Sequence, residues 1–472
     1  MSYLQWILLE AMVVLGFVSA LVLIPRIIME RRQAGATLAW LLIVVLMPYI
    51  GVPLFLLIGG RRVERVRESK RRPRLEPEER SAASFRDEVS ESAWDIASLM
   101  LRYGGSPPRR GNSLQIITDG QEVYDSILEA IDGAQDHVEV CTYILGRDRT
   151  GDGITDKLTE KARQGVDVRL LTDSVGSMWA RRTSLWSLRR AGGRTGSFLP
   201  MLTFRRRAAA HLRNHRKIVV VDDRVAFVGG MNMSCEYMGP PLARRRWRDI
   251  MVRLEGPPAA DLHYVFDADW EFTTSESPRE ASYRDPPASG GATVQIVPDG
   301  PDVPENPIAS GVTTAVARAR ERVWIVSPFY VPDEWFANSL ETAARMGCDV
   351  RLVVPQRTNI RTADLAGRSY LDSLMAAGAR VFRYEKGFLH AKLLVVDDTL
   401  AGVGSFNLDV RSFHLNFEIG AFLYDRDSIR SIADTITDIQ DDARQLDPEQ
   451  FGSRGGLVRF TEDTCRLLSP LL

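Results

Sequence analysis

Two stretches of the sequence carry the same polar residues at the same spacing. Residues 215–232 read HRKIVVVDDRVAFVGGMN, and residues 390–407 read HAKLLVVDDTLAGVGSFN. Both fit the pattern H-x-K-x4-D-x6-G-x2-N. Alternate side chains of a β-strand point to one face, so the histidine and lysine of each copy can reach one anion at the end of the strand. A pattern of this length that occurs twice is far more specific than a single short motif.

The two copies together supply the groups that cleavage of a phosphodiester requires. The candidate catalytic residues are His215, Lys217, Asp222, His390, Lys392 and Asp397, and the candidate phosphate-binding amides are Asn232 and Asn407. Lysine and asparagine can stabilise phosphate oxygens by charge and by hydrogen bonds. If the copies face each other, one imidazole can attack phosphorus while the other protonates the departing alkoxide. We therefore predict a single phosphoryl-transfer site to which both copies contribute.

The motif belongs to a larger duplication, because neighbouring segments recur in the same order. LQIITDG at Leu114 matches VQIVPDG at Val294, and VDVRLLT at Val166 matches CDVRLVV at Cys348. Within each copy, short β-branched runs alternate with helical patterns, which is typical of an α/β fold with a largely parallel sheet. We predict two tandem α/β/α sandwich domains, residues 113–290 and 291–472, related by a pseudo-twofold axis.

The first 72 residues predict a membrane segment. Residues 4–24 and 36–58 are nearly continuous apolar runs, each close to the ~20 residues that a helix needs to cross a bilayer. Eight Lys/Arg lie between Arg61 and Arg74, and the positive-inside rule places this flank and the catalytic domains in the cytoplasm. Basic residues between the two runs would then face outward, so full crossing and incomplete insertion both stay open. Residues 73–112 are predicted to be a linker with a short helix near 85–103.

Charge and cysteine usage narrow the choice of partners. Residues 174–221 contain eleven Lys/Arg and no acidic residue, interleaved with Trp179 and Trp186. This composition suits an anionic membrane surface, although Trp186 could equally face the core. The four cysteines form no CxxC pair, so we expect buried thiols and no metal site. Structural or surface positions are predicted for the remaining histidines, His137, His211, His263 and His414.

The motif pair resembles that of the phospholipase D superfamily, and over nearly the whole chain the sequence is similar to the bacterial cardiolipin synthases. The similarity is carried by WLLIVVLMPYIGVPLFLLIGGRR at Trp40, RNHRKIVVVDD at Arg213, SPFYVPD at Ser327 and FNLDVRSFHLNFEIG at Phe406. It implies transfer of a phosphatidyl group from one phosphatidylglycerol to another through a phosphohistidine, with release of glycerol and without a metal or cofactor. It also implies mostly structural roles for the two motif aspartates.

The resemblance further implies a carboxylate that orients each imidazole. Glu418 in LNFE is the candidate for His390, and Asp249 in WRDI is the candidate for His215. The glycine turns differ, because the first copy has Gly230 where the second has Ser405. The Ser405 hydroxyl is a candidate for supporting the phosphate site. This difference suggests unequal roles for the two halves and leaves open which histidine attacks.

Three other functions remain compatible with the motifs. A phospholipase D-type hydrolase would use water as acceptor. A membrane-tethered nuclease would need a basic groove with stacking aromatic residues. A non-catalytic membrane scaffold would need neither motif to be intact. The apolar N-terminal segment favours lipid over nucleic acid. We expect phosphatidylglycerol and anionic membrane lipid as partners, and a multi-pass location in the bacterial plasma membrane. The sequence leaves the oligomeric state open.

Overall fold

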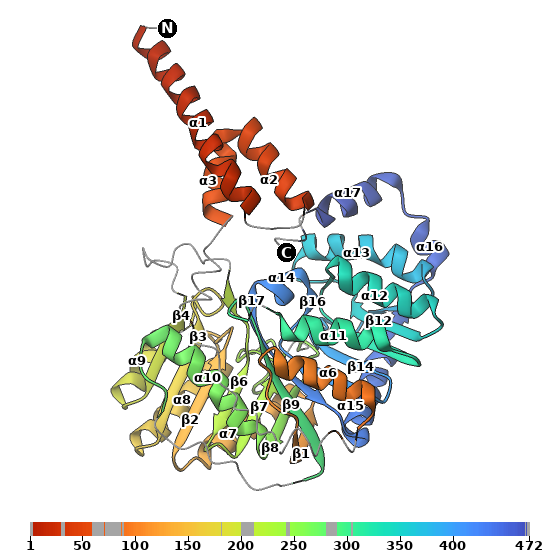
Figure 1. The fold of residues 1–472 in the computed structure, drawn as a ribbon. Helices are drawn as coiled ribbons and strands as arrows, with labels where there is room; N and C mark the ends of the chain where they lie inside the picture. Colours follow the sequence, from red (N-terminus) through yellow and green to blue (C-terminus); the bar gives the residue numbers. More distant parts are fainter. Residues whose placement is uncertain are drawn as a thin grey trace. The chain divides into compact units, whose positions relative to one another are not determined.

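The computed structural model describes most of the chain in two units (Figure 1). The described residues are 3–29, 34–58, 70, 86, 89–180, 182–199, 212–241, 246–279, 290–303, 305–467 and 469. The first unit contains α1, α2 and α3, and the second contains the elements from α6 onwards. Most of the basic run from Arg61 to Arg74, the first part of the predicted linker, and His211 lie outside the described residues.

The first unit consists of α1 (Tyr3–Met29), α2 (Ala34–Leu46) and α3 (Pro48–Ile58). The second apolar run therefore forms two helices and not the single helix that we predicted. Proline lacks the backbone N–H of a helix interior but is well placed at the first position, so α2 ends before Pro48 and α3 begins there. No helix among the described residues combines the length and apolarity of a membrane crossing, so the predicted pair of transmembrane helices is not confirmed.

Sixteen of the described strands of the second unit form one sheet, and the order of its strands is symmetric about its centre. One half runs β4-β3-β2-β6-β7-β8-β1, and the other half mirrors it as β13-β12-β10-β14-β15-β17-β9, with β1 and β9 paired antiparallel in the middle. β18 (Ala443–Gln445) extends the second half, and β5 (Arg213–Asn214) pairs with β17. The first half comprises β1 (Arg109–Ile117), β2 (His137–Thr142), β3 (Asp167–Asp173), β4 (Arg194–Phe198), β6 (Ile218–Val221), β7 (Val225–Gly229) and β8 (Met251–Glu255). The second half comprises β9 (Ala292–Asp299), β10 (Arg322–Val326), β12 (Asp349–Pro355), β13 (Arg380–Tyr384), β14 (Leu393–Val396), β15 (Leu400–Gly404) and β17 (Asn416–Leu423). The mirrored order is what a duplication of one fold produces.

The sheet is mixed, which corrects our expectation of a largely parallel one. Apart from the short parallel pairing of β5 with β17, the parallel strands are β2-β3-β4 in one half and β10-β12-β13 in the other. The motif strands β6 and β14 run antiparallel to both of their neighbours, and one of these neighbours is the strand into which the chain turns directly after the motif aspartate. Both motif strands are buried along their whole length, as the sequence predicted.

Helices cover both faces of each half, which agrees with the predicted α/β class (Figure 1). In the first half, α7 (Gly120–Asp132), α8 (Arg149–Arg163) and α9 (Arg182–Arg190) share a core with Val138 and Val140 of β2. The alternate residue of β2, Glu139, contacts His263 of α10 (Pro258–Thr274) on the opposite face. In the second half, one face carries α6 (Glu91–Arg102), α11 (Pro307–Arg318), α12 (Glu334–Arg345) and α13 (Arg361–Ala376), and the other carries α15 (Arg426–Asp441).

The helix predicted within the linker is α6, and it belongs to the core of the second half. Ala93, Ile96, Ala97 and Met100 of α6 are buried together with residues of α11. Short elements complete the unit: a two-stranded sheet of β11 (Tyr330–Val331) and β16 (Leu408–Asp409), then α14 (Val410–His414), α16 (Pro448–Gly452) and α17 (Gly456–Arg466). The domain boundaries proposed from the sequence stay a prediction.

The two motif aspartates perform the same structural task in the two halves. Asp222 accepts hydrogen bonds from three successive backbone N–H groups at residues 135–137, each at 2.8 Å. Asp397 accepts the equivalent bonds from residues 320–322 at 2.8 to 2.9 Å. Each aspartate stands at the end of its motif strand away from the motif histidine, and both have a left-handed φ, 53° and 49°. They tie the hairpin turn to the start of the neighbouring strand.

Because of these bonds, Asp397→Ala should destabilise the fold more than it impairs catalysis. Removing the acceptor leaves up to three backbone donors without their partner, and each lost bond of this charged kind costs about 1.5–3 kcal/mol. We expect a lower free energy of unfolding in denaturant titration, with turnover per folded molecule within a few-fold of the unsubstituted protein. A stable variant with severely reduced turnover would instead assign this carboxylate to the chemistry.

Candidate active site

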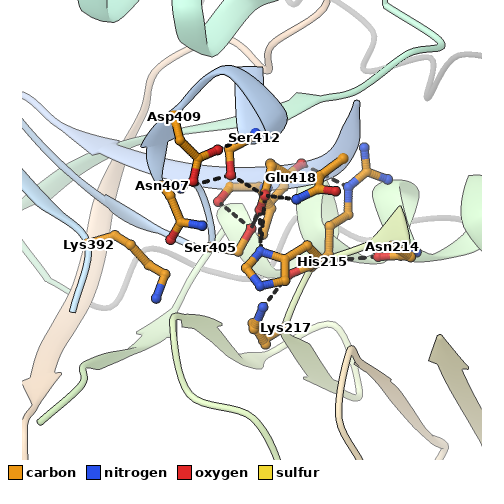
Figure 2. A network of polar contacts seen from close by, with 12 residues as sticks. Asn214, His215, Lys217, Lys392, Ser405, Asn407, Asp409, Ser412 and Glu418 are labelled. Carbon is orange, nitrogen blue, oxygen red and sulfur yellow. Dashed lines mark hydrogen bonds and ion pairs between the residues drawn. The ribbon is translucent and has the colours of Figure 1, made fainter. Parts of the chain in front are cut away.

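The histidine of the first motif is held by the second half of the chain. β5, directly before His215, pairs in parallel with the start of β17, and the backbone N–H of His215 donates to the carbonyl of Phe417 at 2.9 Å. The Nδ1 atom of His215 then lies 3.0 Å from both carboxylate oxygens of Glu418 (Figure 2). The carboxylate therefore fixes one ring nitrogen and leaves Nε2 for chemistry.

The histidine of the second motif is held by the first half in the same way. Leu389 forms an isolated bridge with Arg248, and the backbone N–H of His390 donates to the carbonyl of Arg248 at 2.8 Å. Nδ1 of His390 lies 2.6 Å from Oδ2 of Asp249. Each half thus supplies the carboxylate for the imidazole of the other half.

This exchange corrects our sequence-based pairing, which joined Glu418 to His390 and Asp249 to His215. Both carboxylates were identified, but each was assigned to the histidine of its own copy. Order along the chain favours that assignment, whereas the structure places each motif beside the strand or loop of the opposite copy. The two halves are therefore linked through the residues that position the imidazoles.

Glu418 is embedded in a set of short polar contacts that Figure 2 shows around its carboxylate. Ser412 donates to it at 2.9 Å and Asn416 at 3.2 Å, and Ser405 donates its hydroxyl to the other oxygen. Ser405, expected to support the phosphate site, thus contacts the orienting carboxylate. Burial raises the pKa of Glu418, but His215 and Lys217 outweigh this effect and hold the pKa below its usual value. The carboxylate is accordingly ionised beside the imidazole.

The glycine at the equivalent position of the first half has a steric explanation. A Cβ atom at Gly230 would collide with the carboxylate of Asp249. The shorter aspartate occupies the space that the Ser405 side chain fills in the second half, so the two halves use different solutions for the same support. Sequence comparison of the copies shows the difference but gives no reason for it.

The two histidines line one cavity of about 390 Å³. Both motif asparagines, Asn232 and Asn407, also line it, together with the aromatic residues Tyr143, Tyr237, Trp247 and Phe329. The ring centroids of Tyr143 and His215 are 5.2 Å apart, and those of Tyr237 and His390 are 5.0 Å apart. The cavity therefore brings together the imidazoles and amides that the sequence predicted, whereas the lining does not include Asp222 or Asp397.

Comparisons with known proteins show to which family the chain is similar. The family described as "Cardiolipin synthase, PLD-like domain" matches residues 127–270 and 312–439, and "Phospholipase_D-nuclease N-terminal" matches residues 18–60. The chain is 36% identical over 454 residues to the cardiolipin synthase of Geobacillus kaustophilus, covering 94% of this chain and 90% of that protein. The cardiolipin synthase of Staphylococcus aureus strain Mu50 is 36% identical over 468 residues, covering 94% and 93%.

The chain belongs to the cardiolipin synthase family. The family resemblance inferred from the motifs is thereby confirmed. Among solved structures, a phosphatidylserine synthase of Haemophilus influenzae matches with a TM-score of 0.59 at 14% identity, over 76% of this chain and 95% of that one. At this identity the match concerns the fold alone.

In this member of the cardiolipin synthase family both motif lysines are buried beside the histidines. Nζ of Lys217 donates to the backbone carbonyl of His215, and Nζ of Lys392 lies 2.7 Å from Nδ1 of His390. Burial lowers the pKa of Lys217 to about 7, with a further contribution from the charge of Lys392. Burial also lowers the pKa of Lys392 to about 8, in spite of the nearby Asp249 and Glu418.

These lysine pKa values predict an alkaline loss of activity in the free enzyme. Only the protonated ammonium attracts a phosphate, and its fraction decreases as pH rises through about 7 and about 8. We expect kcat/KM to decrease over this range, while kcat decreases only at higher pH because bound phosphate stabilises the charged lysines. Full pH profiles of both parameters test this, and a kcat/KM that stays level to about pH 10, the ordinary lysine region, would contradict it.

Burial also lowers the pKa of both histidines, that of His390 to about 3. In the free enzyme this shift favours the neutral form of each imidazole, which is the form required for attack on phosphorus. The negative charge of a bound phosphodiester favours protonation of the second imidazole, the one that must act as acid.

A buried cationic group behind the site was not identified from the sequence. Arg216, which follows His215, donates to the backbone carbonyls of Glu418 and Asp299 and pairs with Asp269 at 2.6 Å. Lys70 pairs with the same Asp269 at 2.8 Å and with Asp302 at 2.6 Å. Lys70 lies in the run that we interpreted as a membrane-flanking charge cluster, so its fully buried position is a correction. Composition alone does not distinguish one buried lysine within a basic run.

Two groups of side chains in the described part of the chain are close enough to hold a cation: His137, Glu139 and His263, and Asp148, Cys235 and Glu236. Neither group lines the active-site cavity. His137 and His263 both contact Asp223, which fits the structural role expected for them. Of the four free cysteines, Cys141 and Cys348 are buried, whereas Cys235 and Cys465 are partly exposed and depart from the expectation.

Proposed function

We propose that this protein synthesises cardiolipin by transferring a phosphatidyl group between two phosphatidylglycerol molecules through a phosphohistidine. The observation that carries the proposal is that each half of the chain supplies the carboxylate that holds the motif histidine of the other half. Because Glu418 holds His215 and Asp249 holds His390, both imidazoles line one cavity together with the two motif asparagines. One phosphodiester can then be contacted by both halves.

In the first step, Nε2 of one neutral imidazole attacks the phosphorus of the donor phosphatidylglycerol. The bond between phosphorus and the glycerol headgroup oxygen breaks, and the second imidazole, in its protonated form, gives its proton to that oxygen. Free glycerol leaves, and the phosphatidyl group remains bonded to the first histidine. Nε2 is the reacting atom because Nδ1 of each ring is engaged by a carboxylate.

In the second step, the terminal hydroxyl of another phosphatidylglycerol loses its proton to the imidazole that acted as acid. The resulting oxygen attacks phosphorus, the phosphorus–nitrogen bond breaks, and cardiolipin is formed with both histidines restored. The lysines and motif asparagines stabilise the phosphoryl oxygens in both steps, and one such preorganised donor is typically worth ~100- to 1,000-fold in rate.

We also propose that the protein acts at a membrane surface, on the basis of apolar side chains exposed in each unit considered separately. In the first unit the exposed set includes Phe17, Leu21, Val22, Leu42 and Leu46. In the second unit, α17 exposes Leu457 and Phe460, 81% and 68% accessible, while its Glu462 is 1% accessible. Large exposed apolar patches mark interaction sites, and a surface helix that buries Glu462 while it exposes Leu457 and Phe460 suits an apolar partner.

A truncation tests the membrane role of the first unit. Removal of residues 1–69 should leave an enzyme body that folds but binds vesicles less tightly, as sedimentation with phosphatidylglycerol-containing vesicles would show. Removal of residues 1–72 should be less stable, because it also deletes Lys70 and leaves two buried carboxylates with one cation fewer. Equal thermal stability of the two truncations would contradict the importance of this ion pair.

Incubation of the purified protein with phosphatidylglycerol in detergent tests the proposed reaction. Cardiolipin and glycerol in equal amounts support it. Phosphatidic acid with glycerol would identify a hydrolase, and no conversion together with cleavage of single-stranded DNA would identify a nuclease.

A further inference from the structure

The proposed reaction places an additional phosphate in the cavity during its second step. Glycerol, which leaves in the first step, carries no charge. The acceptor phosphatidylglycerol brings its own phosphodiester, separated from the attacking hydroxyl by the three glycerol carbons. A transferase that uses this acceptor therefore needs a cation beyond the groups that bind the reacting phosphate, whereas a hydrolase does not.

The cavity lining contains two guanidinium groups besides the motif residues, Arg213 and Arg411. Arg213 is 3% accessible and donates to Asp173 and Ser174, so it is held in the body of the first half. Arg411 is partly exposed at the cavity. It lies on α14, which begins directly after Asp409, whose carboxylate caps the helix by accepting from the backbone N–H of Ser412 at 2.7 Å.

The position of Arg411 breaks the symmetry of the duplication. It is the fourth residue after Asn407, and the fourth residue after Asn232 in the first copy is Glu236. Glu236 does not line the cavity. At this position of the motif, one copy presents a permanently charged group that can bind phosphate through two parallel hydrogen bonds, and the other copy has a carboxylate. The reaction requires this asymmetry, because the non-reacting phosphate of the acceptor lipid has to be bound on only one side of the cavity.

We propose that Arg411 binds the non-reacting phosphate of the acceptor lipid and so selects phosphatidylglycerol over water and neutral alcohols. This inference rests on the proposed transferase function and names the acceptor side of the same cavity. Arg411 is thus a specificity-determining residue, whereas the motif lysines and asparagines serve the reacting phosphate.

Two assays on the full-length protein separate the two steps. Incorporation of labelled glycerol into phosphatidylglycerol reports formation and reversal of the phosphohistidine with an uncharged acceptor. Cardiolipin formation reports use of the phosphate-bearing acceptor. Arg411→Gln should reduce cardiolipin formation roughly 10- to 100-fold, as loss of a charged hydrogen-bonding partner does, and leave glycerol exchange within about threefold. Arg411→Lys should recover part of the loss, and Arg345→Ala, at an exposed position on α12, serves as the matched control.

The outcomes distinguish this inference from the proposed function. A selective loss of cardiolipin formation, with a raised KM for the acceptor and intact exchange, supports the role of Arg411. Parallel loss of both reactions, or no loss of cardiolipin formation, overturns it. If the unsubstituted protein neither exchanges glycerol nor forms cardiolipin, the proposed function itself fails.

Discussion

His215→Ala and His390→Ala should each reduce cardiolipin formation by roughly 10,000-fold or more, as loss of one member of a cooperating catalytic group does. One substitution removes the atom that forms the covalent bond, and the other removes the proton donor for a poor alcohol leaving group. Both imidazoles line one cavity and each has a different task in the reaction, so neither can replace the other. Cardiolipin formed from labelled phosphatidylglycerol measures the loss directly.

The matched control is His414→Ala, because His414 is a partly exposed histidine that pairs with Asp333 outside the cavity lining. It should keep turnover within a few-fold of the unsubstituted protein. Turnover within about tenfold in either motif variant, far from the loss expected for an acting group, would show that a single histidine suffices.

The second large effect concerns the exchanged carboxylates. Glu418→Gln and Asp249→Asn should each reduce turnover by roughly 100- to 10,000-fold, because an amide can hold the wrong imidazole tautomer and cannot stabilise the imidazolium. Glu385→Gln, at an exposed position paired with Arg444, is the matched control. A loss of less than about threefold in both variants would contradict the orienting role.

The exchange itself is tested with an activated donor, a phosphatidyl ester of nitrophenol, whose leaving group needs no acid. With this donor, the variant lacking the attacking histidine should give no nitrophenol burst, whereas the variant lacking the acid should keep one. The structure predicts that Glu418→Gln behaves like His215→Ala, and Asp249→Asn like His390→Ala. The opposite correspondence would restore the pairing within each copy that the sequence favoured.

Much of the site could be predicted because the sequence repeats it. Two intact motifs identified the histidines, lysines and asparagines, and the segments around them identified the duplication. The orienting partners could not be assigned correctly, since the contact between His215 and Glu418 depends on the pairing of β5 with β17 across the two halves. Local order along the chain contains no information about that pairing.

Two further differences between the sequence-based predictions and the structure also have specific physical causes. Pro48 divides the second apolar run into α2 and α3, although its hydropathy is continuous. The motif aspartates were grouped with the catalytic residues because they belong to the motif, although the family resemblance implied mostly structural roles for them. In the structure they accept hydrogen bonds from backbone N–H groups far along the strand from the histidines, as that resemblance implied. A motif defines which residues occur together, and it does not define which of them face the same cavity.

The central claim is that both halves of the chain act on one phosphodiester at one site. The most direct test is the number and position of phosphatidyl groups attached to the protein after rapid alkaline quenching with phosphatidylglycerol, followed by intact-mass and peptide mass spectrometry. We predict at most one group per chain, on either His215 or His390 and always on the same one. Two groups on one chain, or a group bonded to any other residue, would contradict a shared site.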